Sequence, residues 1–151
     1  MLRTRRASYA LVAALAMATV ACSSSSSSSS GSAAGDPDTS TGGDVASTVK
    51  DFSISLDPTE VAAGEVKFTI TNEGPNTHEF VVVKTDTAPG DLPVDGELVN
   101  EDGIDVIGEA EDIAPSTSSE LVLTLEAGQY AIICNIEGHY AQGMYAGLTV
   151  T

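Results

Sequence analysis

Basic residues are scarce in this chain. It holds 6 Lys and Arg against 22 Asp and Glu, and its formal net charge is −16. A surface this acidic repels phosphates, which excludes nucleic acid as a partner. The same charge favours electrostatic steering toward a basic partner protein, or serves only to keep the chain soluble in a salty exterior.

Side chains that bind soft metals are also scarce. The chain has two Cys, two His and three Met. Beyond residue 22 only Cys134, Met144 and the two histidines, His78 and His139, remain. A single Cys in that part allows no disulfide within it. An exported free thiol is prone to oxidation unless it is buried or bound to a metal.

The apolar run over residues 9–21 is too short to cross a bilayer as a helix, which needs about 20 residues. It follows Arg3, Arg5 and Arg6 and ends in small residues. A basic start, a short apolar run and small residues are typical of a secretory signal. We therefore predict a signal peptide over residues 1–21 and export of the chain.

The segment ATVAC, which ends at Cys22, resembles the lipobox of bacterial lipoproteins, although Thr19 stands where Leu is usual. In that pattern the Cys becomes the lipid-modified first residue of the mature protein. We predict lipidation of Cys22, which gives this thiol a use and anchors the chain to the extracytoplasmic face of the cell membrane. Ordinary signal cleavage near Ala21 is the alternative.

Two further regions follow the signal. Residues 22–44 consist mainly of Ser, Gly, Ala and Asp, which offer little to bury, so we predict a flexible tether. Residues 45–151 suffice for one domain with one core. Their short alternating runs, separated by Gly, Pro and Asn, predict an all-β, two-sheet sandwich. The expected strands cover residues 49–56, 61–63, 66–71, 78–84, 119–125, 130–134 and 146–150.

The segment 85–115 does not alternate for long and is rich in acids. We expect a long connection there, with at most a short strand or helical turn near residues 98–107. Its Gly-Glu-Ala-Glu-Asp run, residues 108–112, predicts a solvated loop or a docking surface.

The stretch from Cys134 to Met144 sets a thiolate, an imidazole and a thioether at equal spacing, with His139 in the middle. Together with His78 they form the ligand set of a blue-copper site, two His and one Cys with a weak axial Met. Each residue alone has an ordinary structural explanation, such as a buried Cys acting as a small hydrophobe. All four coincide here, which predicts one copper ion held by His78, Cys134, His139 and Met144.

The pattern C-x4-H-x4-M after a strand, with a lone His upstream, resembles the cupredoxins, and its spacing is most similar to the rusticyanin and auracyanin branch. The resemblance covers residues 45–151. It implies a Greek-key sandwich and a one-electron carrier, not an enzyme, whose partners are redox proteins of the cytochrome or oxidase type. The resemblance also implies that His139 reaches the surface as an electron port. Ile136, Tyr140 and Ala141 are expected to form an apolar docking rim around it.

Relatives often carry Asn or Ser after the first His ligand, where this chain has Glu79. Hydrogen bonds around a metal site tune it, so the reduction potential cannot be taken from relatives. Two other functions stay open, namely copper storage or delivery without redox traffic and a metal-free recognition module. Few Met and His residues disfavour the first, and the complete ligand set disfavours the second.

Overall fold

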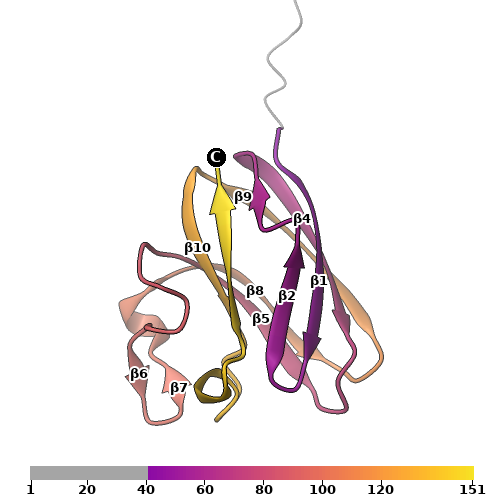
Figure 1. The fold of residues 1–151 in the computed structure, drawn as a ribbon, viewed down its shortest axis with the longest axis vertical. Helices are drawn as coiled ribbons and strands as arrows, with labels where there is room; N and C mark the ends of the chain where they lie inside the picture. The colour runs from indigo at the N-terminus through magenta and orange to yellow at the C-terminus, as the bar shows by residue number, and fades with distance from the viewer. Residues whose placement is uncertain (1–40) are drawn as a thin grey trace, which may run out of the picture. The chain divides into compact units, whose positions relative to one another are not determined.

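A computed structural model describes residues 41–151, which fold into two β-sheets and a small separate hairpin (Figure 1). The predicted all-β sandwich is confirmed. The strands are β1 (Gly43–Lys50), β2 (Ser53–Asp57), β3 (Glu60–Val61), β4 (Gly64–Asn72), β5 (His78–Lys84), β6 (Val94–Asp95), β7 (Leu98–Val99), β8 (Asp105–Ile113), β9 (Ser118–Leu125), β10 (Gly128–Ile133) and β11 (Tyr145–Val150). Two short 3-10 helices, η1 (Glu101–Gly103) and η2 (Tyr140–Gln142), complete the set.

The two sheets have different strand orders. The first is β2-β1-β4-β9 and the second is β3-β11-β10-β5-β8, while β6 and β7 pair only with each other. β1 runs parallel to β4 and β3 runs parallel to β11, whereas the other pairs are antiparallel. Strands β5 and β10, at whose ends the first two predicted ligands lie, are therefore direct neighbours inside the second sheet.

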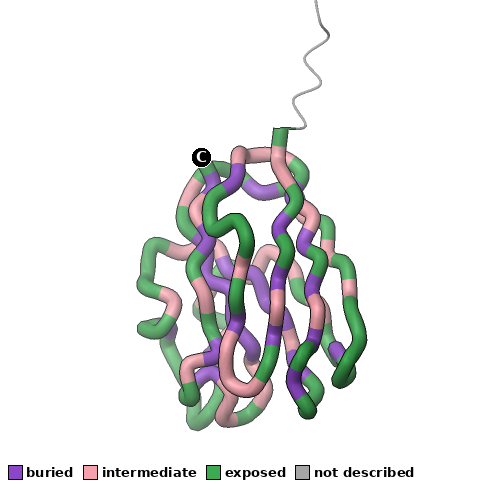
Figure 2. The backbone as a smooth tube through the Cα atoms, turned by 45° about the vertical axis from the view of Figure 1, so that its right-hand side comes forward, coloured by how far each residue is buried: buried purple, intermediate pink, exposed green. Residues whose placement is uncertain are grey.

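The alternation of β4 shows how the sequence builds the core. Val66, Phe68 and Ile70 are fully buried, while Thr69 between them is exposed. Side chains of a strand point alternately to the two faces of a sheet, so this pattern turns one face of the first sheet toward the second. Figure 2 shows the same alternation of buried and exposed residues along the strands. The core between the sheets extends to Cys134 and Met144.

The outer face of the second sheet is also covered. Val81 and Val83 of β5 lie in a second buried cluster with Leu92, Val99 and Tyr140. The residues from the 85–115 segment and from the loop after β10 thus shield β5 on the face opposite the core. This explains why β5 reads as a nearly continuous apolar run, because a strand buried on both faces need not alternate.

Two expectations about strands were wrong. Residues 49–56 form the end of β1, a corner at Asp51–Phe52 and β2, which folds back antiparallel to β1. Residues 108–112 belong to β8, which pairs with β5, and so they are not a loop. The sequence pattern did not reveal β8, because its register with β5 shifts between residues 78 and 80 and again between 82 and 83. These shifts interrupt the alternation of apolar and polar residues along β8.

The start of the described chain and its C-terminus lie together. The Gly42 N–H donates to the Ala63 carbonyl at 3.1 Å, and the Ala63 N–H donates to the Thr151 carbonyl at 2.8 Å. Figure 1 places this end opposite the loop that joins β10 to β11. β1 begins at Gly43, two residues before the expected start of the domain. Among residues 41–151, no helix has the length and apolar character needed to cross a membrane.

Candidate metal centre

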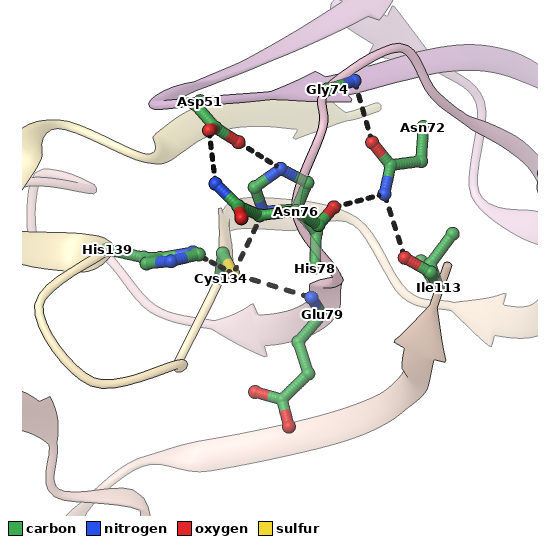
Figure 3. A network of polar contacts seen from close by, with 9 residues as sticks. All are labelled: Asp51, Asn72, Gly74, Asn76, His78, Glu79, Ile113, Cys134 and His139. Atoms are coloured by element: carbon green, nitrogen blue, oxygen red, sulfur yellow. Dashed lines mark hydrogen bonds and ion pairs between the residues drawn. The ribbon is translucent and has the colours of Figure 1, made fainter. Parts of the chain in front are cut away.

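Three predicted ligands come together at the end of the sandwich away from the C-terminus (Figure 3). His78 is the first residue of β5, and Cys134 directly follows β10. The Sγ of Cys134 lies 4.0 Å from Nδ1 of His78 and 3.4 Å from Nδ1 of His139. One donor atom from each of the three residues falls within 4.8 Å of the other two. Pairing of β5 with β10 thus fixes one His and the Cys on rigid backbone.

The loop from Cys134 to Met144 folds back on itself. His139 precedes η2, and two glycines with positive φ, Gly138 at 79° and Gly143 at 98°, allow the turns on either side. The Met144 N–H donates to the His139 carbonyl at 3.3 Å, and the Cys134 N–H donates to the Met144 carbonyl at 3.1 Å. The backbone of Met144 therefore lies beside both Cys134 and His139.

Burial controls the charge of these ligands. His78 is 0% exposed, and its burial lowers the pKa of the imidazole, so the ring is neutral near neutral pH with one nitrogen free to bind a metal. Burial also raises the pKa of the Cys134 thiol, although the Glu79 backbone N–H, 3.4 Å from Sγ, acts in the opposite direction. The thiol consequently keeps its proton in the metal-free protein and gives it up when a metal binds.

Comparison with known proteins identifies the family. Residues 11–146 match the family model of the cupredoxin-like domain. The chain belongs to the cupredoxin family. No curated protein sequence matches it.

Solved structures share the fold of this cupredoxin. A dithionite-reduced auracyanin from the photosynthetic bacterium Roseiflexus castenholzii is 23% identical, with a TM-score of 0.50, and the match covers 74% of this chain and 98% of that one. Rusticyanin from Thiobacillus ferrooxidans is 18% identical, with a TM-score of 0.56 and coverages of 72% and 76%. An azurin from Methylomonas sp. strain J is 19% identical, with a TM-score of 0.54 and coverages of 72% and 97%.

The donor set of this cupredoxin fits one type 1 copper ion. A sulfur at about 2.3 Å and a nitrogen at about 2.0 Å from one metal ion lie about 3.5–3.8 Å apart at the usual angles. The observed separations from Cys134 Sγ, 3.4 Å to His139 and 4.0 Å to His78, bracket that range. Two imidazoles and one thiolate, with the fully buried Met144 beside them, are the ligands that blue-copper sites use.

Two residues near the histidines escaped the sequence analysis. Oδ1 of Asp51 lies 2.9 Å from Nε2 of His78, and the ring of Phe52 meets the ring of His139 edge-on with centroids 5.2 Å apart. Both come from the corner between β1 and β2 in the other sheet. No motif marks them, because their proximity to the ligands arises only when the two sheets pack.

The predicted docking rim is partly wrong. Ala141 is exposed and Ile136 is half-buried, but Tyr140 is only 5% exposed. Its hydroxyl points inward, where it accepts the Leu92 N–H at 2.9 Å and donates to the Pro89 carbonyl at 2.8 Å. Tyr140 therefore anchors the covering segment and takes no part in an exposed rim. The predicted lipidation site, Cys22, lies outside the described residues.

Proposed function

We propose that this cupredoxin is a type 1 copper protein that carries single electrons outside the cytoplasm and is tethered to the membrane by a lipid on Cys22. One observation carries the proposal: two imidazoles and a thiol converge from two strands and one loop, and only one of them approaches the surface. His78 and Cys134 are 0% exposed, whereas His139 is half-buried.

The chain's own residues supply a rigid and dry cage. A bound copper ion would provide one-electron redox chemistry, alternating between Cu(I) and Cu(II). β5 and β10 hold His78 and Cys134, and backbone hydrogen bonds hold the loop that carries His139 and Met144. A cage that cannot rearrange favours fast electron transfer, because little nuclear movement accompanies the change of charge. The partly exposed ring of His139 gives the electron its route to a partner.

The proposed tether agrees with the positions of the chain ends. The described chain begins at the end of the sandwich opposite the ligand loop (Figure 1). The proposed tether over residues 22–44 would thus join the domain at the end far from His139. The junction with the tether would then leave the surface around His139 open to other redox proteins.

A basic redox protein of the cytochrome or oxidase type is the partner that the charge favours. Lys50, Lys67 and Lys84 are the only basic residues within residues 41–151, and each pairs with a Glu, at 3.7, 2.6 and 2.6 Å. Glu97 and Glu137 are exposed near the port, and the Glu97 carbonyl accepts the Gly138 N–H at 3.3 Å. Long-range attraction between such an acidic surface and a basic partner raises the rate of encounter.

Copper storage or delivery is less well supported. Such a role requires ligands that release the metal readily to another protein, whereas His78, Cys134 and Met144 are all 0% exposed. An enzymatic role has less support, because both histidines of the chain belong to the proposed copper site and no histidine remains to activate a nucleophile.

A visible absorption spectrum tests the copper assignment. We expect the protein to gain an intense blue band with one equivalent of Cu(II) and to lose it reversibly with ascorbate. Cys134→Ser should lack the band, whereas Cys22→Ser, which removes the other thiol, should keep it. Tight copper binding without a band would favour storage or delivery, and no copper binding by the folded protein would favour a recognition module.

Cell fractionation and kinetics test the tether and the partner. Wild-type protein should sediment with membranes, and Cys22→Ser should be released into the soluble extracytoplasmic fraction. Electron transfer to a basic c-type cytochrome, used as the probe, should slow as ionic strength rises and in Glu97→Lys. A soluble wild-type protein would refute the anchor, and a rate independent of salt would refute the charge-steered partner.

A further inference from the structure

Asp51 lies against the outer nitrogen of a copper ligand. Its Oδ1 is 2.9 Å from Nε2 of His78, while Nδ1 of the same ring is the nitrogen that approaches Cys134 (Figure 3). The Asp51 side chain is 20% exposed and that of His78 is 0% exposed. Both atoms are buried and neither has a hydrogen-bond partner among the described residues, so the 2.9 Å contact has the distance of a hydrogen bond but lacks its angle.

The local structure holds Asp51 in this place. Its second oxygen, Oδ2, accepts a hydrogen bond from Nδ2 of Asn76 at 2.5 Å. Gly74 lies directly over the pair, and a Cβ there would come within 3.0 Å of both Asp51 Oδ1 and His78 Nε2. A side chain at residue 74 would therefore crowd both atoms, and the glycine in the turn before β5 leaves room for their contact.

The loop that carries Asn76 and Gly74 is itself fixed by a buried amide. Asn72 is 1% exposed, and its Nδ2 donates to the carbonyls of Asn76 and Ile113, both at 2.8 Å. Its Oδ1 accepts the Gly74 N–H at 2.8 Å. With donors and acceptor all satisfied, Asn72 ties this loop to the end of β8. The approach of Asp51 to His78 is therefore built into the fold.

We propose that Asp51 is a positioning residue that keeps the proton of His78 on Nε2, presents Nδ1 to copper and stabilises Cu(II) relative to Cu(I). The inference rests on the proposed copper function. A neutral imidazole carries one N–H, and a carboxylate beside Nε2 favours the tautomer with the proton there. Such carboxylate–histidine–metal arrangements raise the basicity of the ligand. A negative charge this close to the metal also favours its more positive oxidation state.

Nitrogen NMR of the metal-free protein tests the positioning directly. We expect wild-type His78 to be the Nε2–H tautomer. Asp51→Asn, whose amide oxygen can still accept that N–H, should keep the tautomer, and Asp51→Ala should give a mixture. A wild-type ring protonated on Nδ1, or an unchanged ring in Asp51→Ala, would overturn the proposal. If a variant fails to fold, a wild-type ring protonated on Nδ1 still overturns the proposal.

Voltammetry of the mature, copper-loaded protein tests how the charge of Asp51 affects the reduction potential. Asp51→Asn should raise the Cu(II)-to-Cu(I) reduction potential. We expect the ratio of the protein's affinities for Cu(II) and Cu(I) to fall about tenfold, which equals about 59 mV for one electron. Asp44→Asn is the matched control, because Asp44 is an exposed acid near the other end of β1. Equal potentials in the two variants would refute the electrostatic role of Asp51.

Gly74→Ala provides a variant that leaves every charge in place. Its added methyl should push the carboxylate away from His78, so the potential should move in the same direction as in Asp51→Asn. If Gly74→Ala keeps the wild-type reduction potential, the contact between Asp51 and His78 does not set that potential. These outcomes are separable from failure of the copper assignment: absence of a blue band in wild-type protein refutes the proposed function, while a blue protein insensitive to Asp51 refutes only this inference.

Discussion

The side chain of Asn135 pairs with the backbone of Val99 in the way a neighbouring strand would. Its Oδ1 accepts the Val99 N–H at 2.7 Å, and its Nδ2 donates to the Val99 carbonyl at 3.1 Å and to Oε1 of Glu101 at 2.6 Å. Asn135 follows Cys134 directly. These bonds therefore tie the ligand loop to the segment that covers the outer face of the second sheet.

Asn135→Ala should destabilise the metal-free protein. Val99 is 3% exposed, so its N–H and carbonyl would lose their partner without full access to water. We expect a loss of about 1–3 kcal/mol in the free energy of unfolding, measured by urea denaturation. Asn100→Ala is the control, because that exposed side chain makes a single bond, to the Asp102 N–H at 3.1 Å. Equal losses of unfolding free energy in the two variants would mean that the bonds from Asn135 to Val99 stabilise the protein no more than an exposed hydrogen bond does.

Substitutions of Met144 should tune the copper without removing it. Met144 is 0% exposed, and Leu fills nearly the same volume, so the fold should tolerate the change. Loss of the thioether in Met144→Leu removes a donor that helps Cu(II), and the reduction potential should rise. Met144→Gln offers a harder oxygen donor, which favours Cu(II), and the potential should fall. Wild-type potentials in both variants would show that Met144 is not the axial ligand.

Tyr140 and Tyr145 form a matched pair for testing whether the Tyr140 hydroxyl is buried. Their ring centroids are 5.4 Å apart, but Tyr140 is 5% exposed and Tyr145 is 38% exposed. Tyr140→Phe would leave the buried Leu92 N–H without its acceptor, so we expect a loss of about 1–3 kcal/mol on urea unfolding. Tyr145→Phe should change stability by about 0.5 kcal/mol or less. A larger loss of stability in Tyr145→Phe than in Tyr140→Phe would contradict the buried position of the Tyr140 hydroxyl.

The sequence predicted best where local pattern and chemistry coincide. β5 was predicted with its observed bounds, and the order of ligands along the chain pointed to one cluster. Gly138 and Gly143 stand directly before His139 and Met144 in the sequence, and both have positive φ. In each case neighbours in sequence decide the outcome, either through alternation along a strand or through spacing within one loop.

Long-range packing produced the failures. In β1 the buried residues are odd-numbered, Val45, Ser47 and Val49, but in β2 Ile54 is the buried residue. This change of parity marks the corner at residues 51–52, which a single alternating run over residues 49–56 conceals. Asp51 could be placed beside His78 only after the two sheets were known to pack.

Tyr130 gives the protein a predictable response to alkaline pH. It is 3% exposed, and its hydroxyl donates to the Glu126 carbonyl at 2.8 Å. Burial raises the pKa of the phenol above its ordinary value of about 10, although nearby Lys84 opposes this. The unfolded chain therefore loses this proton first as pH rises. Its contribution to stability is complete below about pH 10 and disappears as the pH passes through the pKa of the folded state.

At neutral pH, Tyr130→Phe should lose about 1 kcal/mol with its hydrogen bond. Above pH 10, its free energy of unfolding should fall less steeply than that of the wild type, so the two urea-derived curves should converge. Curves that stay parallel to pH 11 would contradict a buried, protonated phenol.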